Sequence, residues 1–193
     1  MSFSHFQILL PEAGMTIVRT VTFWFFSITE VLFWLHSLDM MNIVNRIEIN
    51  SGLDDFVLLD RISEIGAATI AGKKKYFNDP AYLGIESLAQ LGAYHVRFLT
   101  GFENHAFLLK INQCAIPANH ILNGSYLLKG TLVSQSKSAF CYELQAGKGN
   151  KVQIEGEFLY ATIDYDRMFN KKILQAHYRK VFSCLQKESK TDC

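Results

Sequence analysis

Two polar side chains, Glu86 and Gln90, interrupt an otherwise apolar stretch, and the chemistry of this chain is sought there first. They are four residues apart, so in a helix they lie on the same face, one turn from each other. The residues from Leu83 to Leu99 are apolar on more than one face, which is typical of a buried helix. A carboxylate on a buried helix costs free energy unless it is paired or takes part in chemistry. The alternative to a role in chemistry is that Glu86 is a structural carboxylate, bonded to Gln90, to Arg97 or across a dimer. Residue type alone favours this alternative.

The segment just before this helix is polar and aromatic, with the sequence YFNDPAYL from Tyr76 to Leu83. Pro80 removes a backbone donor and excludes a regular helix here. Asn78 and Asp79 precede Pro80 and either shape a turn or contact a substrate. Asp79 is the nearest further acid that could serve as a base, and Tyr76 could donate a hydrogen bond to a substrate.

A basic run, Lys73, Lys74 and Lys75, stands ahead of that segment. Its plainest interpretation is the solvated end of a strand. The alternative is a landing patch for an acidic partner.

The composition indicates one domain with a sizeable core. The chain has 193 residues, of which 49% are hydrophobic and 13% aromatic. A net charge of +1 gives no electrostatic argument for nucleic acid. The four cysteines are far apart and form no CxxC pair, so we expect reduced thiols in a cytoplasmic protein, with no structural zinc or other metal and no disulfide framework.

Residues 1–41 form a hydrophobic N-terminal extension that differs from the rest of the chain. Thr20 to Leu38 has the length of a membrane span but carries Glu30 near its middle. Three interpretations stay open. Residues 16–38 are a membrane-associated segment, which would make the protein peripheral to a membrane, or they form a hydrophobic helix packed on the body or on a partner. In the third interpretation the stretch is not translated. The third is slightly favoured, because Met41 stands just ahead of the globular pattern.

Residues 42–165 have the pattern of an α+β domain. Two strands are predicted at Phe56–Ile65 and Ala67–Tyr76, ahead of the apolar helix. After Gly101 four more follow, at 107–116, 125–133, 139–144 and 152–163, separated by turn signals. Alternation of polar and apolar residues indicates an antiparallel sheet covered on one face, and the single apolar helix must cover it. Residues 166–193 predict a basic amphipathic helix, docked on the domain or on a dimer partner, with a membrane surface as the alternative.

This order, two strands, one buried helix and four antiparallel strands, is that of the hotdog fold, in which a curved sheet wraps a central helix. Three segments strengthen the resemblance. FVLLDRISEIG (Phe56–Gly66) resembles the opening strand of FabZ-type hydroxyacyl-acyl-carrier-protein dehydratases. LGIESLAQLGAY (Leu83–Tyr94) is similar to the start of their central helix, and INQCAIPANHILN (Ile111–Asn123) to a later strand and turn. The match runs from about Asp54 to Ile163.

The resemblance implies a site and a reaction. These enzymes remove water from a 3-hydroxyacyl thioester carried on the phosphopantetheine arm of acyl carrier protein, with no other cofactor. Glu86 matches their helix glutamate, Gly84 their helix-start glycine and Gln90 their glutamine. The N–H of Gly84 or a neighbour would hold the thioester oxygen, because a helix start offers free donors and a positive dipole end.

One motif of the family is missing. No histidine stands where the family has "HFP", and Tyr76-Phe77-Asn78 occupies that place. The aryl-polyene-type dehydratase homologues, which also carry asparagine there, resemble the chain more closely. Glu86 would then be the general acid, or base and acid in turn.

The resemblance also implies partners and leaves two other activities open. It implies acyl carrier protein as partner, docked on Lys73 to Lys75, and a homodimer or a heterodimer with another hotdog subunit. The alternatives to a dehydratase are an acyl thioesterase, which needs only one acid and a water, and a non-catalytic subunit that binds an acyl thioester or pairs with an active homologue.

Overall fold

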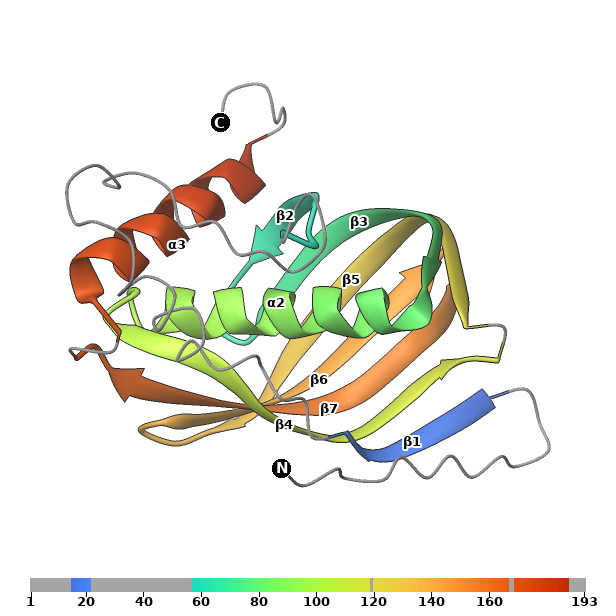
Figure 1. Cartoon of the computed structure of the whole chain (residues 1–193). Coiled ribbons are helices and arrows are strands. Elements are labelled where there is room, and N and C mark those ends of the chain that lie inside the picture. Colours follow the sequence, from blue (N-terminus) through green and yellow to red (C-terminus); the bar gives the residue numbers. More distant parts are fainter. Residues whose placement is uncertain (1–14, 22–56, 119, 167–168, 188–193) are drawn as a thin grey trace, which may run out of the picture.

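The computed structural model describes residues 15–21, 57–118, 120–166 and 169–187, which form one sheet and two helices (Figure 1). The strands are β1 (Met15–Val21), β2 (Arg61–Ile65), β3 (Thr69–Pro80), β4 (Asn104–Pro117), β5 (Ile121–Gln135), β6 (Ala139–Lys148) and β7 (Lys151–Asp164). The helices are α2 (Ala81–Leu99) and α3 (Lys171–Gln186). In space the strand order is β1-β4-β7-β6-β5-β3-β2, and every neighbouring pair is antiparallel.

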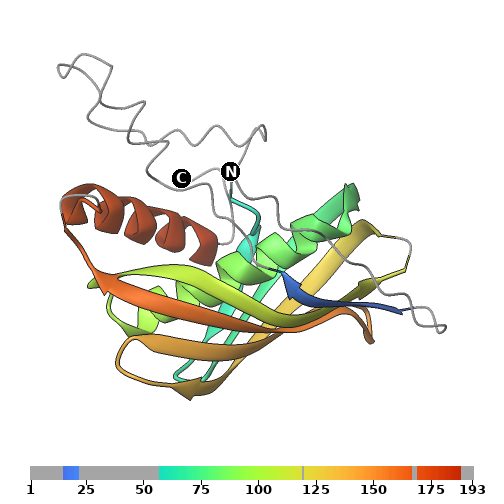
Figure 2. The ribbon, with the colours of Figure 1, turned by 60° about the horizontal axis from the view of Figure 1, so that its bottom comes forward.

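The sheet curves around α2, which lies along its concave face (Figures 1 and 2). The α+β class, the two strands ahead of the helix and the four antiparallel strands after it are therefore confirmed. This is the arrangement that the sequence resemblance predicts for a hotdog fold.

Small residues let α2 lie close against the sheet. A β-carbon at Gly84 would overlap the side chains of Ile154 and Leu122, and one at Gly92 would overlap Tyr160. Close contact over nineteen helical residues buries the apolar side of α2, including Leu88 and others that are fully enclosed. The helix axis is thereby held at a fixed position over the strands, and any side chain on α2 is positioned with it.

His95 adds a polar tie between helix and sheet. It is fully buried, and its Nε2–H donates to the Gly66 carbonyl oxygen at 2.8 Å. That bond leaves Nδ1 as the acceptor for the Tyr142 hydroxyl at 2.9 Å. The network satisfies both ring nitrogens and fixes one neutral tautomer, so His95 is a structural residue.

Three boundaries differ from the sequence prediction. The helix begins at Ala81 and not at Gly84, because Pro80 is its N-cap and proline is well tolerated at a helix start. β3 continues through the YFNDP segment as a strand. β2 begins at Arg61, whereas residues 57–59, predicted as strand, are not in a strand.

The N-terminal extension is described only at β1. Met15–Val21 pairs with β4 at the edge of the sheet, a strand that the sequence analysis did not predict. The interpretations of residues 1–14 and 22–56, including most of the segment 16–38, lie outside the described residues. Among the described residues no helix has the length and apolar character needed to cross a membrane.

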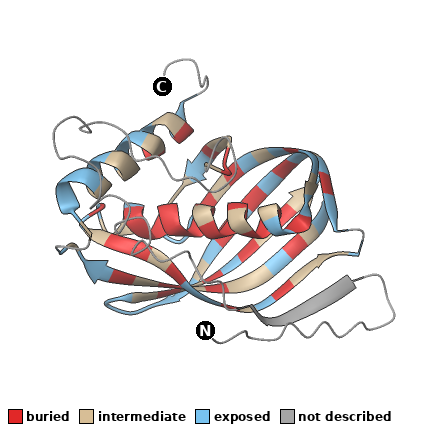
Figure 3. Ribbon diagram, viewed as in Figure 1, coloured by how far each residue is buried: buried red, intermediate tan, exposed pale blue. Residues whose placement is uncertain are grey.

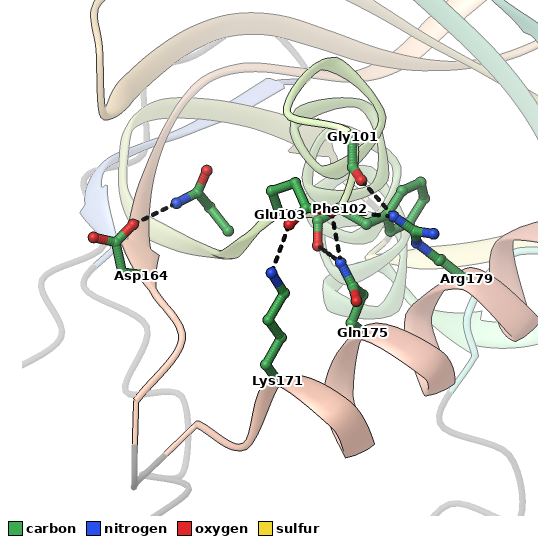
Figure 4. A network of polar contacts seen from close by, with 8 residues as sticks. Gly101, Phe102, Glu103, Asp164, Lys171, Gln175 and Arg179 are labelled. Carbon is green, nitrogen blue, oxygen red and sulfur yellow. Dashed lines mark hydrogen bonds and ion pairs between the residues drawn. The ribbon is translucent and has the colours of Figure 1, made fainter.

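The predicted C-terminal helix is present as α3, and it docks on its own domain. Phe182 and Leu185 are buried, and the Phe182 ring contacts Phe102, Phe98 and Tyr94 near the end of α2. Glu103 connects the body to α3 through Lys171, Gln175 and Arg179 (Figure 4).

The cysteine prediction is only partly correct. Cys114 and Cys141 are free thiols, as expected. Cys184, on α3, is disulfide-bonded. The expectation of reduced thiols throughout was therefore wrong for Cys184, because spacing in the sequence does not show which cysteines meet in space.

Candidate functional site

Glu86 lies on the side of α2 that faces away from the sheet. Gly84, Leu88 and His95 contact the sheet, and Glu86 lies on the other side of the helix because successive residues are about 100° apart. Its side chain is half-buried, and burial raises its pKa above the usual range for a glutamate. Within the described part of the chain its carboxyl group has no hydrogen bond or ion pair. A protonated carboxyl group is therefore more populated here than at the surface, which suits a general acid.

The start of α2, one turn before Glu86, presents free backbone donors. Pro80, the N-cap, has no N–H and makes no side-chain cap. The N–H of Ala81 donates to the carbonyl oxygen of His120 at 2.9 Å. The N–H groups of Tyr82 and Leu83 have no intrahelical acceptor and no other partner among the described residues. Two donors at the positive end of the helix dipole are thus available to an oxyanion.

Gly84 and Gln90 have other contacts than those that the resemblance implied. The N–H of Gly84, the fourth residue of α2, faces the carbonyl of Pro80 in the helix ladder, so the neighbours Tyr82 and Leu83 carry the free donors. Gln90 Oε1 accepts a hydrogen bond from the N–H of Leu58 at 2.9 Å. It fastens the segment ahead of β2 to the helix, and no bond joins it to Glu86.

Tyr76 belongs to the core. It is 1% exposed, and its hydroxyl donates to Ser87 Oγ at 2.9 Å, while Ser87 donates to the Leu83 carbonyl at 2.8 Å. Its ring meets the Tyr126 ring edge to face. The Tyr76 hydroxyl thus donates its hydrogen bond to a residue of the fold, Ser87.

Asn78 and Asp79 shape a bulge at the end of β3. Asn78 has φ of 59°, the left-handed region that asparagine tolerates better than most residues, and the pairing with β5 shifts there. Asp79 Oδ2 accepts from the N–H of Phe77 at 2.8 Å, which closes the bulge. The turn-shaping interpretation accounts for the geometry of both residues, and neither forms a hydrogen bond with Glu86 within the described part of the chain.

The three lysines divide between the two faces of β3. Lys74 faces the concave side and pairs with Asp60 Oδ1 at 3.2 Å. Lys73 and Lys75 are exposed on the opposite side, with the Lys75 ammonium 4.7 Å from the Phe77 ring centroid. The period of two in a strand separates neighbours in this way, so Lys74 does not share a face of β3 with Lys73 and Lys75.

Sequence reasoning missed two features of this region, Tyr82 and His120. Tyr82 is 56% exposed on the Glu86 side of the helix, one turn earlier. His120 meets the helix start because the end of β3 pairs with the start of β5, where Pro80 lies opposite Ile121. In the sequence Pro117 and Asn119 indicate a turn between β4 and β5, but only the pairing of the strands shows that this turn lies at the helix start.

Comparison with known proteins gives remote structural likenesses only. No protein-family model matches the chain, and neither does a curated protein. One similar structure is the dehydratase heterocomplex ApeI:P from Xenorhabdus doucetiae, with 13% identity, a TM-score of 0.46, and coverage of 59% of this chain and 86% of that one. The thioesterase HI1161 from Haemophilus influenzae has 12% identity, a TM-score of 0.47, and coverage of 53% and 77%. The putative thioesterase yhdA from Lactococcus lactis has 13% identity, a TM-score of 0.45, and coverage of 55% and 95%. Such remote likeness identifies no activity for this chain.

Proposed function

We propose that this protein acts on acyl thioesters carried by acyl carrier protein, and that Glu86 is its reactive acid. The observation that carries the proposal is a half-buried carboxyl group with a raised pKa and no partner among the described residues. A carboxyl group left unpaired in such a place costs folding free energy, and function is the usual reason for retaining it. The free N–H groups of Tyr82 and Leu83, one turn away, support a thioester oxygen bound at the helix start.

The reaction that we propose is removal of water across the α and β carbons of a 3-hydroxyacyl thioester, as the motif resemblance implies. Glu86 in its carboxylate form takes the proton from the α-carbon, and the enolate oxygen is held by the helix-start donors. The same group, now protonated, gives the proton to the leaving hydroxyl. One residue acting as base and acid in turn works best with a pKa above the usual range for a glutamate, and burial raises the pKa of Glu86 in that direction.

A second candidate function is hydrolysis of the thioester. Asp79 is engaged in the bulge of β3, and the described residues show no base beside Glu86. A single carboxylate that activates one water needs no such base, and this favours a thioesterase. A non-catalytic subunit that binds an acyl thioester, or that pairs with an active homologue, is the remaining alternative.

One assay separates these functions. The purified protein is given 3-hydroxyacyl and saturated acyl pantetheine thioesters, and each reaction is followed both by the ultraviolet absorbance of an α,β-unsaturated thioester and by release of free thiol. Dehydration gives the first signal and hydrolysis the second. Glu86→Gln is expected to lower turnover by a factor of about 10²–10⁴, and Glu64→Gln, an exposed glutamate of β2, is the matched control. Equal turnover in the wild type and Glu86→Gln would remove Glu86 from the mechanism, and absence of both signals would leave the binding subunit.

A further inference from the structure

At the end of α2 that is farther from Glu86, a cluster of buried polar atoms lacks hydrogen-bond partners in the described part of the chain. Its members are Arg97 Nε on α2, His105 Nδ1 near the start of β4, and the Tyr165 hydroxyl just after β7. Arg97 is eleven residues beyond Glu86, which is about 16 Å along the helix axis, so this cluster is separate from the candidate site. Polar atoms in a protein interior are nearly always paired, and several exceptions in one place require an explanation.

Ring contacts bring the three side chains together under α3. The centroid of the Tyr178 ring, on α3, lies 3.9 Å from the guanidinium carbon of Arg97 and 5.9 Å from the centroid of the His105 imidazole. The Tyr165 ring is centred 6.2 Å from the same imidazole. An Nη group of Arg97 also donates to the carbonyl oxygen of Ala106, the residue next to His105, at 2.7 Å. Arg97, His105 and Tyr165 thus form one cluster beneath the helix.

The charge of Arg97 has no counter-ion within the described residues. Its side chain is 7% exposed and forms no ion pair there. Glu103, an acid at this end of the domain, is already engaged by Lys171 and Arg179 of α3 (Figure 4). An arginine stays charged at any ordinary pH, and a buried charge without an opposite charge costs free energy. A negative group bound at the unpaired Nε–H of Arg97 would remove this cost.

The other two members of the cluster suit the same kind of ligand. The Tyr165 hydroxyl can donate to an oxygen atom, and so can His105 Nδ1, either in the neutral Nδ1–H tautomer or in the charged imidazolium. The groups that face the imidazole are Arg97 from α2, Tyr165 from the end of β7, and Tyr178 from α3. None of these is a carboxylate, so the surroundings of the cluster are positive and rich in donors.

The helix that covers the cluster, α3, is held to the body by few buried residues. Phe182 and Leu185 are its buried positions, and Figure 3 shows the rest of the helix as exposed or intermediate. Its ion pairs to Glu103 come from Lys171 and Arg179, whose side chains are more than half exposed, and such pairs contribute little to stability. A shift of α3 would therefore open the cluster to solvent at low cost, whereas the hydrophobic core holds α2 and the sheet in place.

We propose that Arg97, His105 and Tyr165 bind a small oxyanion, a carboxylate or a phosphate group, beneath α3. Arg97 supplies its Nε–H and the positive charge, Tyr165 its O–H, and His105 an Nδ1–H. The oxygen atoms of the anion then pair the polar atoms that the fold leaves without a partner. A water molecule could bond to the same atoms, but it would leave the charge of Arg97 without a counter-ion.

Titration with two probe anions tests this site. The full-length protein is titrated with sodium acetate and, separately, with inorganic phosphate, while sodium chloride keeps the ionic strength constant. Heteronuclear NMR follows the Nε–H signal of Arg97, which is assigned by its loss in Arg97→Lys. We expect a saturable shift of this signal, and the anion that saturates it at the lower concentration identifies the ligand as a carboxylate or a phosphate group.

Two variants separate a built site from general attraction of anions. Tyr165→Phe keeps the ring and removes one donor, so it is expected to weaken binding by a factor of about 10, and it carries the comparison if Arg97→Lys does not fold. Arg179→Lys, at an exposed arginine of α3, is the matched control and is expected to leave the affinity unchanged. The proposal is overturned if neither anion shifts the Arg97 signal beyond the effect of sodium chloride, or if Tyr165→Phe binds as tightly as the wild type. Either result would leave water as the partner of these atoms. No thioester enters the experiment, so its result is independent of the proposed activity.

Discussion

At the scale of single residues, the polar groups of Glu86 and Tyr76, on the neighbouring elements α2 and β3, differ in burial and in hydrogen bonding. The Tyr76 hydroxyl is satisfied by Ser87 and enclosed, whereas the Glu86 carboxyl group is half-buried and has no partner in the described part of the chain. The first arrangement stabilises the fold, and the second costs stability and is available for chemistry.

The pKa of Glu86 gives a prediction about stability. Because burial raises the pKa of Glu86, the folded state loses stability as the pH rises through the ordinary glutamate pKa and up to the raised one. Glu86→Gln removes that penalty, so at neutral pH it is expected to unfold at a higher temperature than the wild type while turnover falls. Thermal unfolding at pH 7 and at pH 4 measures this, with the gain expected only at the higher pH. A lower unfolding temperature at pH 7 would mean that the carboxylate has a stabilising partner.

Tyr76 gives a prediction that separates a structural role from a substrate contact. Tyr76→Phe removes the hydrogen bond to Ser87 and is expected to lower the free energy of unfolding by about 1 kcal/mol. Turnover of the folded variant should be unchanged, because the hydroxyl is enclosed. Urea unfolding together with the thioester assay checks both points, and Tyr126→Phe, whose hydroxyl is bonded to Gln153, serves as the comparison. A raised KM with unchanged stability would return Tyr76 to the substrate site.

At the scale of elements, the position of α2 depends on how closely it approaches the strands. Gly92 stands where any β-carbon would meet the Tyr160 ring, and the Tyr160 hydroxyl donates to the Ala89 carbonyl of the same helix at 3.0 Å. A larger residue at position 92 would therefore increase the distance between α2 and the sheet, and this would move Glu86.

Gly92→Ala is expected to destabilise the protein by about 1–3 kcal/mol, because Tyr160 is enclosed and overpacking is costly. Gly66→Ala is the control, since the nearest atom to a β-carbon there is at 3.5 Å, an ordinary contact. Chemical denaturation compares the two variants, and equal stabilities would show that α2 adjusts its height freely.

The bulge at the end of β3 gives a second prediction at this scale. Asn78 has a φ of 59°, which glycine adopts freely and a β-branched residue adopts only with strain. Asn78→Gly is expected to be tolerated, and Asn78→Val to cost about 1–2 kcal/mol. If turnover falls only in the destabilised Asn78→Val variant, Asn78 only shapes the backbone. Loss of turnover in a stable Asn78→Gly would indicate that the amide contacts the substrate.

At the scale of the whole molecule, two buried histidines link the stability of the fold to pH. His105 is 4% exposed under α3, and burial, followed by the charge of Arg97, lowers its pKa to about 4. Burial also lowers the pKa of His95. In the unfolded chain both titrate near about 6.5, so the unfolded state binds more protons between that pH and the lower folded value.

The stabilising effect of neutral His105 is therefore complete above pH 6.5, roughly, and is lost as the pH falls toward 4, by about 3 kcal/mol at the lower end. Urea unfolding between pH 7.5 and pH 4, roughly, measures the slope, which His105→Phe should reduce. A slope that is the same in the variant would assign the acid sensitivity to other groups.

How much of this protein follows from its sequence depends on the range of the interactions. Apolar periodicity predicts both helices and the strands β2 to β7, though not β1, and a spacing of four residues puts Glu86 and Gln90 on one side of a helix. Both effects act within a few turns of chain. The same patterns determine that one helix must cover one antiparallel sheet. These are the parts of the fold and of the candidate site that could be predicted.

Only the tertiary structure decided which of the polar candidates were already engaged. Gln90 is held by Leu58, thirty-two residues away, and Lys74 by Asp60, while the end of β3 pairs with β5 across more than forty residues and brings His120 to the helix start. Such contacts depend on strand pairing over long stretches of chain, which local pattern does not encode. Of the side chains first singled out, Glu86 is left without a partner in the described residues, because α2 turns it away from the sheet and the segment that approaches that side bonds Gln90 through Leu58.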